Sequence, residues 1–243
     1  MSREFEVIRD VDLPAAPDDV WTATTAANAA WQFPTGMEIA AGAAPPEGSP
    51  VTTWDPPHHF VVRMEAPDGS FNALEYVIEA RAGGTAHLHY VHSGILADEW
   101  EDQYDAIGGH TDFYLHTLGQ YLEHFNGRTV TYVGQPSSGI EGPETAGTPD
   151  AMNTLRAALG VSPDARVGDP VHATLGAAGP LDGTIDYATP EFLGVRTADG
   201  LYRFFGRNHY GSVVGMSGHL FADGVDAAAQ EAALKAWLDE VYA

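Results

Sequence analysis

The chain has 243 residues, of which 44% are hydrophobic and 10% aromatic, so it can bury a sizeable core as one large or two small domains. Its 34 acidic and 11 basic residues give a formal charge of −23, which repels phosphate backbones and anionic membranes, so we expect no nucleic-acid or membrane partner. The sequence contains no cysteine, which excludes disulfides, thiol nucleophiles and cysteine-ligated metal clusters.

The motifs of the commonest nucleotide-binding and hydrolytic enzymes are missing. The chain has no Gly-Lys-Ser/Thr triplet, and it lacks the GxGxxG, GxSxG and HExxH patterns, so P-loop, dinucleotide-binding, serine-hydrolase and zinc-protease interpretations lack support. Its one lysine, Lys235, lies in a helical run with a solvated face. We expect no cofactor and no metal site, and the sequence leaves open whether the protein is an enzyme.

A half-buried strand is predicted near the N-terminus. Phe5, Val7 and Val11 alternate with acidic residues in the segment FEVIRDVDL, which is the period of a strand with one solvated face. Pro17 then begins a short helix, because proline in the first turn loses only a donor that has no partner there. Another short helical stretch surrounds Trp31. The sequence shows neither a signal peptide nor a long apolar run, so we expect a cytoplasmic protein.

From residue 51 the pattern predicts an antiparallel meander followed by a long helix. The apolar runs VTTW, HFVVRME, FNALEYVIEA and TAHLHYVHS are separated by turn-forming Pro-Pro, Asp-Gly and Gly-Gly pairs. Between residues 98 and 125 apolar residues recur every three or four positions, as in an amphipathic helix. Acidic residues between Asp98 and Asp105 suit the positive end of the helix dipole, so we interpret them as a cap.

A stretch rich in Gly, Pro and Ser divides the chain. We predict a first domain over residues 1–128, a linker over 129–147 and a smaller α+β domain over 148–243, which again runs from helix to sheet to helix. The segment PHHFVVR, which starts at Pro57, has an echo in PEFLGVR from Pro190, and each precedes an Asp-Gly turn. Chance similarity of two hairpins and a degenerate internal copy both fit this echo.

Residues 1 to 125 carry a combination of segments that resembles one protein family. The matching segments are LPAAP with the following Val-Trp pair, WDPPHHF, a Gly-Thr pair, VHSG, and LGQYL in the long helix. They resemble the activator-of-heat-shock-ATPase-like branch of the SRPBCC, or START-like, superfamily. The resemblance implies a helix-grip fold, in which a curved antiparallel sheet wraps a long C-terminal helix and encloses a cavity. The stretch from Ala40 to Val51 is short for the second and third strands of that family.

Strand alternation predicts which side chains line such a cavity. Residues of one parity in each strand face the long helix, and the polar groups among them need partners. The expected ligand-binding residues are Arg9, Phe60, Val62, Tyr76, Leu88, Tyr90, His92, Ile107, Thr111 and Tyr114. Plain core packing is the alternative for the apolar ones. Arg9 requires a carboxylate or an anionic ligand if it points inward, because a guanidinium is costly to bury unpaired.

Histidines of the opposite parity raise the question of a metal. His87 and His89 share the outer face of their strand, and His58 and His59 are near in sequence. Two imidazoles on one strand bind a divalent metal weakly without further ligands. We therefore interpret them as residues of an exposed strand face.

Three functions are compatible with these features. The first is binding of a small, largely apolar molecule in the helix-grip cavity. The second is a cyclase, dehydratase or hydrolase that uses His92, Tyr76 and Tyr114 as acid–base groups in the same cavity. The third, implied by the resemblance alone, is co-regulation of a chaperone, for which no interface can be named.

Overall fold

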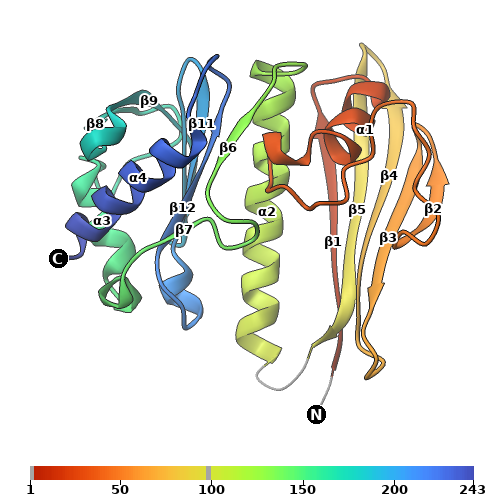
Figure 1. The fold of residues 1–243 in the computed structure, drawn as a ribbon, viewed down its shortest axis with the longest axis horizontal. Coiled ribbons are helices and arrows are strands. Elements are labelled where there is room, and N and C mark those ends of the chain that lie inside the picture. Colours follow the sequence, from red (N-terminus) through yellow and green to blue (C-terminus); the bar gives the residue numbers. More distant parts are fainter. Residues whose placement is uncertain (1–2, 97–99) are drawn as a thin grey trace. The chain divides into compact units, whose positions relative to one another are not determined.

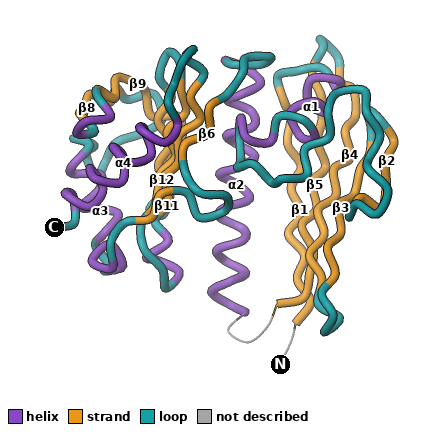
Figure 2. Tube along the Cα trace, in the orientation of Figure 1, coloured by secondary structure: helices purple, strands orange, loops and turns teal. Residues whose placement is uncertain are grey.

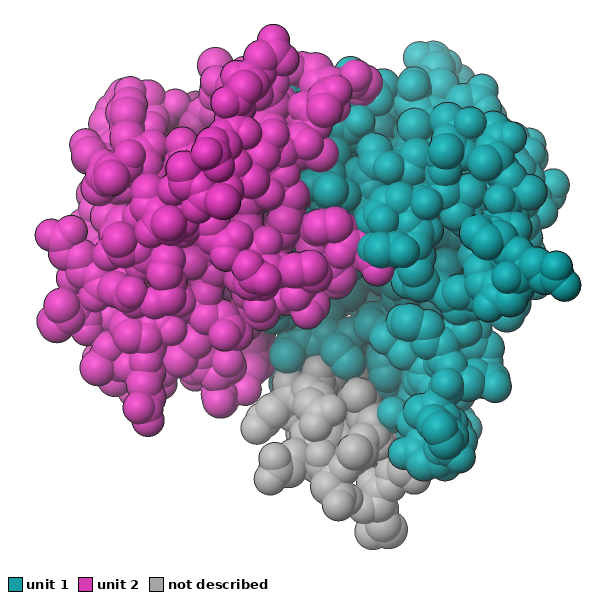
Figure 3. All heavy atoms as spheres, in the orientation of Figure 1, with its two compact units in different colours: residues 1–32, 36–126 teal, residues 33–35, 127–243 magenta. Residues whose placement is uncertain are grey.

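The computed structural model describes residues 3–96 and 100–243. The chain divides into two compact units, which Figure 3 colours separately. Unit 1 comprises residues 1–32 and 36–126, and unit 2 comprises residues 33–35 and 127–243. Each unit combines helices with an antiparallel sheet, as the predicted α+β class requires. Across the described residues, no helix has the length and apolar character that a bilayer crossing demands.

Unit 1 contains a five-stranded antiparallel sheet in the order β1-β5-β4-β3-β2 (Figures 1 and 2). Its strands are β1 (Arg3–Leu13), β2 (Val51–Asp55), β3 (His59–Glu65), β4 (Phe71–Arg81) and β5 (Thr85–Leu96). The predicted meander is confirmed, because β2 to β5 coincide with the four expected apolar runs. Residues 40–50 form no strand, in the segment that is short for the resembled family.

Three helical segments accompany this sheet. They are α1 (Pro17–Thr25), the short 3₁₀ turn η1 (Asn28–Ala30) and the long α2 (Trp100–His124). Asp18 and Asp19 lie in the first turn of α1, where their charges favour the positive end of the helix dipole. Asp98 and Glu99, which belong to the expected cap of the long helix, lie outside the described residues. Helix α1 packs against β4 and β5, and α2 packs against β1, an arrangement consistent with a helix-grip fold.

The strand register of unit 1 is continuous across β1, β5, β4 and β3. Arg9 is paired with Tyr90, Tyr90 with Tyr76, and Tyr76 with Phe60. Directly paired residues of neighbouring strands point to the same face of a sheet. These four side chains therefore form one transverse row on the inner face of the sheet, as strand parity predicted.

Unit 2 contains a larger antiparallel sheet, in which β6-β12-β11-β10-β9-β8 are consecutive neighbours and β7 also pairs with β12. The strands are β6 (Thr131–Val133), β7 (Ile140–Glu141), β8 (Pro170–Thr174), β9 (Pro180–Ala188), β10 (Phe192–Arg196), β11 (Gly200–Phe205) and β12 (Gly215–Leu220). The α-helices are α3 (Ala151–Ala158) and α4 (Ala227–Val241), and the 3₁₀ turns are η2 (Glu144–Gly147), η3 (Gly176–Ala178) and η4 (Arg207–Tyr210). Asp226 caps α4 by accepting a 3.1 Å hydrogen bond from the amide of Ala229.

The stretch that we expected as a linker contributes to the second sheet. Within residues 129–147, β6 pairs with one half of β12 and β7 with the other half. Val133 and Ile140 from these strands are 0% and 4% exposed and belong to the core of unit 2. Gly and Pro indicated the turns here correctly, but the strands between the turns are too short to show a period.

The two sheets share a topological rule. In each unit the first strand in the sequence pairs with the last, β1 with β5 and β6 with β12. From the last strand, both sheets then run back through the preceding strands in order. In both units a C-terminal helix follows the last strand and packs against the first, as α2 does on β1 and α4 on β6.

A buried ion pair crosses three strands of unit 2. Arg203 on β11 donates to both carboxylate oxygens of Asp186 on β9, at 2.8 Å and 3.0 Å, and their side chains are 1% and 5% exposed. Asp186 lies in a register shift where β9 pairs with β10. Gly194 on β10 lies between the partners, and a Cβ there would overlap Asp186 and lie 2.6 Å from Nη1 of Arg203.

We predict that Gly194→Ala destabilises unit 2 by about 2–4 kcal/mol, because the added methyl group pushes apart a buried charge pair. Gly218→Ala is the matched control, since a Cβ at that buried strand glycine finds its nearest atom at an ordinary 3.6 Å. Hydrogen exchange of peptides from β9 to β11, followed during a urea titration, measures the free energy of unfolding of unit 2 separately from that of unit 1. Equal effects of the two substitutions would contradict the prediction.

Candidate functional site

Aromatic rings occupy the middle of the inner face of unit 1. Phe60 and Tyr76 are stacked with centroids 4.4 Å apart and an interplanar angle of 9°, and Tyr90 meets Tyr76 edge-on at 5.1 Å. Trp21 from α1 packs edge-on against Phe60 at 5.3 Å. Because the residues Tyr76 and Tyr90 are 4% and 7% exposed, this cluster is mainly core.

The two buried phenols are partners of each other. A hydrogen bond between the hydroxyls of Tyr76 and Tyr90 gives each a partner on burial. Burial raises the pKa of both hydroxyls above the ordinary value, most strongly for Tyr90, whose pKa the neighbouring Tyr76 and Tyr114 raise further. Both phenols are therefore neutral and poor proton donors near pH 7.

A small cavity lies between Tyr90 and α2. Its volume is about 10 Å³, and its lining consists of Trp31, Gln32, Tyr90, Thr111, Tyr114 and Leu115. This is roughly the space of one water molecule, and the lining offers hydroxyl and amide partners for such a water. The indole of Trp31 is held by a 2.8 Å hydrogen bond from its Nε1 to the carbonyl oxygen of Ala23.

Arg9 occupies the β1 end of the aromatic row and has a carboxylate partner. Its Nε and Nη2 donate to the two carboxylate oxygens of Asp112 on α2, the latter at 3.1 Å. The side chains of Arg9 and Asp112 are 35% and 44% exposed, so water screens the pair. Gly108, one turn earlier on α2, leaves room for the guanidinium, because a Cβ there would lie 3.7 Å from Nη2. The sequence led us to expect either a carboxylate or an anionic ligand as the partner of Arg9, and the structure provides the carboxylate of Asp112.

His92 lies one step beyond Tyr90 on β5, toward the turn that joins β3 to β4. Its Nε2 donates to the amide oxygen of Asn72 at 2.7 Å, and its ring packs edge-on against Phe5 at 5.1 Å. Burial lowers the pKa of His92 to about 4. The imidazole is therefore neutral near pH 7 and can exchange hydrogen bonds with an uncharged group.

Exposure along the inner face changes from one end of the sheet to the other. At the end covered by α1, Ile78 and Leu88 are 1% and 0% exposed. At the end near the β3–β4 turn, Met64 is 43% exposed, and Val62 and Leu74 are half-buried beside His92. We call the inner-face residues Val62, Met64, Asn72, Leu74 and His92 the open end.

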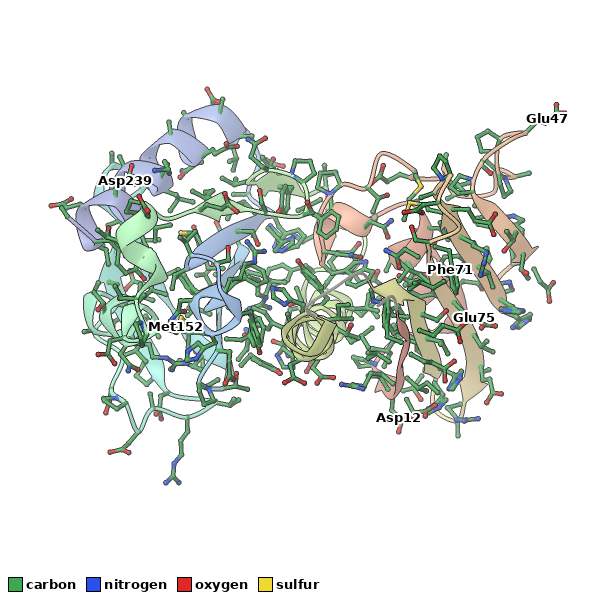
Figure 4. All side chains as sticks on the ribbon, turned by 90° about the horizontal axis from the view of Figure 1, so that it is seen from below. Asp12, Glu47, Phe71, Glu75, Met152 and Asp239 are labelled. Atoms are coloured by element: carbon green, nitrogen blue, oxygen red, sulfur yellow. The ribbon has the colours of Figure 1, made fainter. Side chains whose placement is uncertain are left out.

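The histidines of the outer face are paired with carboxylates. Asp10 accepts from His89 at 2.9 Å and from His87 at 3.2 Å, and Asp12 accepts from His87 at 2.8 Å. The hydrogen bonds from His89 and His87 lower the pKa of Asp10. In the described residues no group of three or more potential ligands has a geometry suited to a metal ion. Asp12, on this face, is labelled in Figure 4.

The structure thus separates the expected site residues into groups. Tyr90, Thr111 and Tyr114 line the small cavity, whereas Val62 and His92 belong to the open end. The remaining ones are Phe60 and Tyr76 in the aromatic cluster, Leu88 in the closed core, Arg9 in its ion pair, and Ile107, which is half-buried on α2.

Sequence reasoning missed several residues of these sites. Trp31 and Gln32 lie in an irregular segment where no period indicates direction, and Asp112 resembles the other acidic residues of the helix. Asn72 shares the inward parity of β4, so strand alternation alone could have identified it, as it did identify Met64 on β3 as facing inward.

No protein-family model matches the chain, and no curated protein matches it. Solved structures resemble it weakly. The Aha1 dimer of Colwellia psychrerythraea is 16% identical, with 49% of this chain and 96% of that chain covered and a TM-score of 0.38. An uncharacterised protein of Rhizobium leguminosarum is 17% identical, with 51% and 97% covered and a TM-score of 0.39.

DynU16, a protein in the dynemicin biosynthetic locus, matches over nearly the whole length. It is 14% identical, with 98% of this chain and 95% of that chain covered and a TM-score of 0.36. At these identities and TM-scores the likenesses establish neither a family nor a function.

We predict that the pKa values of two histidines of β5 are shifted in opposite directions from the ordinary value. Burial keeps the pKa of His92 near 4, whereas the hydrogen bond to Asp12 raises the pKa of His87 above its ordinary value. Stability linked to His92 is therefore lost as the pH falls from about 6.5 toward 4, and stability linked to His87 is lost as the pH rises through its elevated pKa. NMR titration of the imidazole signals, assigned with His92→Gln and His87→Gln, measures both. Coincident midpoints would refute this.

A double-mutant cycle on Arg9 and Asp112 should give a coupling energy of about 0.5–1 kcal/mol, because the pair is bidentate but partly exposed. The variants are Arg9→Met, Asp112→Asn and their combination, compared by urea unfolding. The coupling should fall when the salt concentration is raised, since screening weakens exposed charge pairs. A coupling that is unchanged by salt would show that contacts other than charge hold the two residues together.

Proposed function

We propose that unit 1 binds a small, largely apolar molecule at the open end of the seam between its sheet and α2. The observation that carries this proposal is the exposure of inner-face residues that closed packing would bury. Met64 is 43% exposed on the face whose other end holds Ile78 at 1%. An accessible apolar surface with a few polar groups is the usual character of a small-molecule site.

The polar groups of the open end suit an uncharged ligand group. His92 is neutral near pH 7 because burial lowers its pKa, and its Nε2 is already held by Asn72. Nδ1 of the neutral imidazole is then an acceptor. A hydroxyl or amide group on an otherwise apolar ligand could donate to it, while the apolar body contacts Val62, Met64 and Leu74.

The enzyme hypothesis receives less support from the geometry. It needs Tyr76, Tyr114 and His92 to meet around an accessible cavity. Tyr76 is instead 4% exposed and bonded to Tyr90, while His92 is bonded to Asn72. Groups that satisfy each other in a nearly dry core are poorly placed to exchange protons with a substrate.

We also propose that the chain consists of two domains and that the second is a degenerate copy of the first. The shared strand order supports this, as does the position of the sequence echo. The two matching segments run into β3 and β10, and each of these is the third strand counted back from the last strand of its sheet.

We predict that Leu74→Trp lowers the affinity for N-phenyl-1-naphthylamine, a neutral and apolar fluorescent dye whose N–H can donate to Nδ1 of His92, by about tenfold or more, because the indole fills the open end. Val77→Trp is the matched control, since Val77 is half-buried on the same strand but faces outward. Fluorescence titration of the full chain measures both, and native mass spectrometry detects any molecule that copurifies. Failure of the unsubstituted chain to bind the dye, or equal effects of the two substitutions, would refute the proposed function.

A further inference from the structure

Unit 2 contains a groove whose lining includes a nearly buried arginine. The groove has a volume of about 360 Å³ and is lined by Asn153, Arg156, Pro163, Ala165, Ala188, Thr189 and Pro190. All of these residues belong to unit 2. The volume lies within the range of roughly 300–1,000 Å³ that is common for small-molecule sites.

Arg156, in the last turn of α3, is 8% exposed. Its Nη2 donates to the carbonyl oxygens of Thr189 and of Phe192, the latter at 3.2 Å. These two bonds use both hydrogens of Nη2 and tie α3 to the turn between β9 and β10. In the part of the chain that the structure describes, Nε and Nη1 have no hydrogen-bond acceptor, which leaves three donors of the guanidinium unused.

The charge of Arg156 is also incompletely compensated. Burial lowers its pKa, and Glu191 opposes this shift, yet no carboxylate of the described residues lies within ion-pair distance. Arg203 differs, because that more deeply buried guanidinium is paired with both oxygens of Asp186. Nε and Nη1 of Arg156 retain contact with solvent, so a bound anion can reach the charge and pair with it.

We infer that this groove binds the carboxylate of a small monocarboxylic acid, which accepts a charge-assisted hydrogen bond from a free N–H group, at Nε or Nη1, of Arg156. Because the Nε–H and Nη1–H groups point in different directions, each offers a single donor to a carboxylate oxygen, and such charge-assisted hydrogen bonds are stronger than neutral ones. One negative charge balances one guanidinium, while Glu191 disfavours a dianion such as phosphate. Asn153, one helical turn before Arg156, supplies an amide donor.

The walls of the groove indicate what the rest of the acid looks like. Pro163, Ala165, Ala188 and Pro190 present short apolar surfaces, whereas the polar groups come from Asn153, Arg156 and Thr189. This arrangement suits a compact hydrocarbon or aromatic body attached to the carboxylate. The α3 helix that holds Arg156 can be located in Figure 4 from Met152.

The test uses the full chain with benzoate as the probe, and with benzamide and inorganic phosphate as comparison ligands. The Nε–H signal of Arg156 in a ¹H–¹⁵N spectrum, assigned with Arg156→Lys, should shift and saturate with benzoate. Benzamide and phosphate should bind at least about tenfold more weakly, because the first lacks the charge and the second negative charge of phosphate is repelled by Glu191, whose charge acts on Arg156.

Two variants leave Arg156 and its hydrogen bonds to Thr189 and Phe192 in place, so they distinguish a loss of ligand binding from a loss of folding. Asn153→Leu should weaken benzoate about three- to tenfold through loss of one donor, and Ala165→Phe should abolish binding by filling the groove. Thr154→Leu is the control, since Thr154 is exposed on the same helix but does not line the groove. The inference is overturned if benzoate leaves the Nε–H signal unmoved, if benzamide or phosphate binds as well, or if Ala165→Phe binds normally. The proposed function in unit 1 is unaffected by any of these results.

Discussion

The pairing of β1 with β5 is the constraint on which the rest of unit 1 depends. It joins the first strand to the last over eleven residue pairs without a register shift, from Arg3 with Leu96 to Leu13 with Ala86. A slip of one residue would turn every inner side chain outward. The register therefore decides that Arg9 meets Tyr90 and that its guanidinium can reach α2.

Three kinds of hydrogen-bond partner occur among the buried polar side chains discussed above. Tyr76 and Tyr90 satisfy each other, and Arg203 has a dedicated carboxylate in Asp186. Arg156 has two backbone carbonyls and retains unused donors toward a groove. Because these unused donors keep contact with solvent, the third arrangement is the one that a ligand can complete.

Much of unit 1 could be predicted because its strands are long and regular. Alternation along β3, β4 and β5 correctly placed Phe60, Tyr76 and Tyr90 on one face. It could not distinguish the closed end from the open end, since exposure depends on how α1 covers the sheet. Trp31 and Gln32 come from an irregular segment that carries no period at all.

The strands and the ion pair of unit 2 were harder to predict from the sequence, because of local features of its strands. Strands β6 and β7 contain three and two residues, too few for alternation to be visible. The bulge that positions Asp186 breaks the parity of β9, so the pattern around it could not indicate an ion pair with Arg203. The groove residues are separated in sequence and become neighbours when α3 packs beside the β9–β10 turn.

The position of β12 has a consequence for the order in which the chain can fold during synthesis. Thr131 pairs with Leu220, so β6 waits for a partner that the ribosome makes almost ninety residues later. The hairpins from β8 to β11 can close as they emerge, because their partners are adjacent in sequence. β6 and β7 cannot, and they expose unpaired backbone until the last strand arrives. Nascent chains that stop short of β12 would therefore carry open strand edges in unit 2.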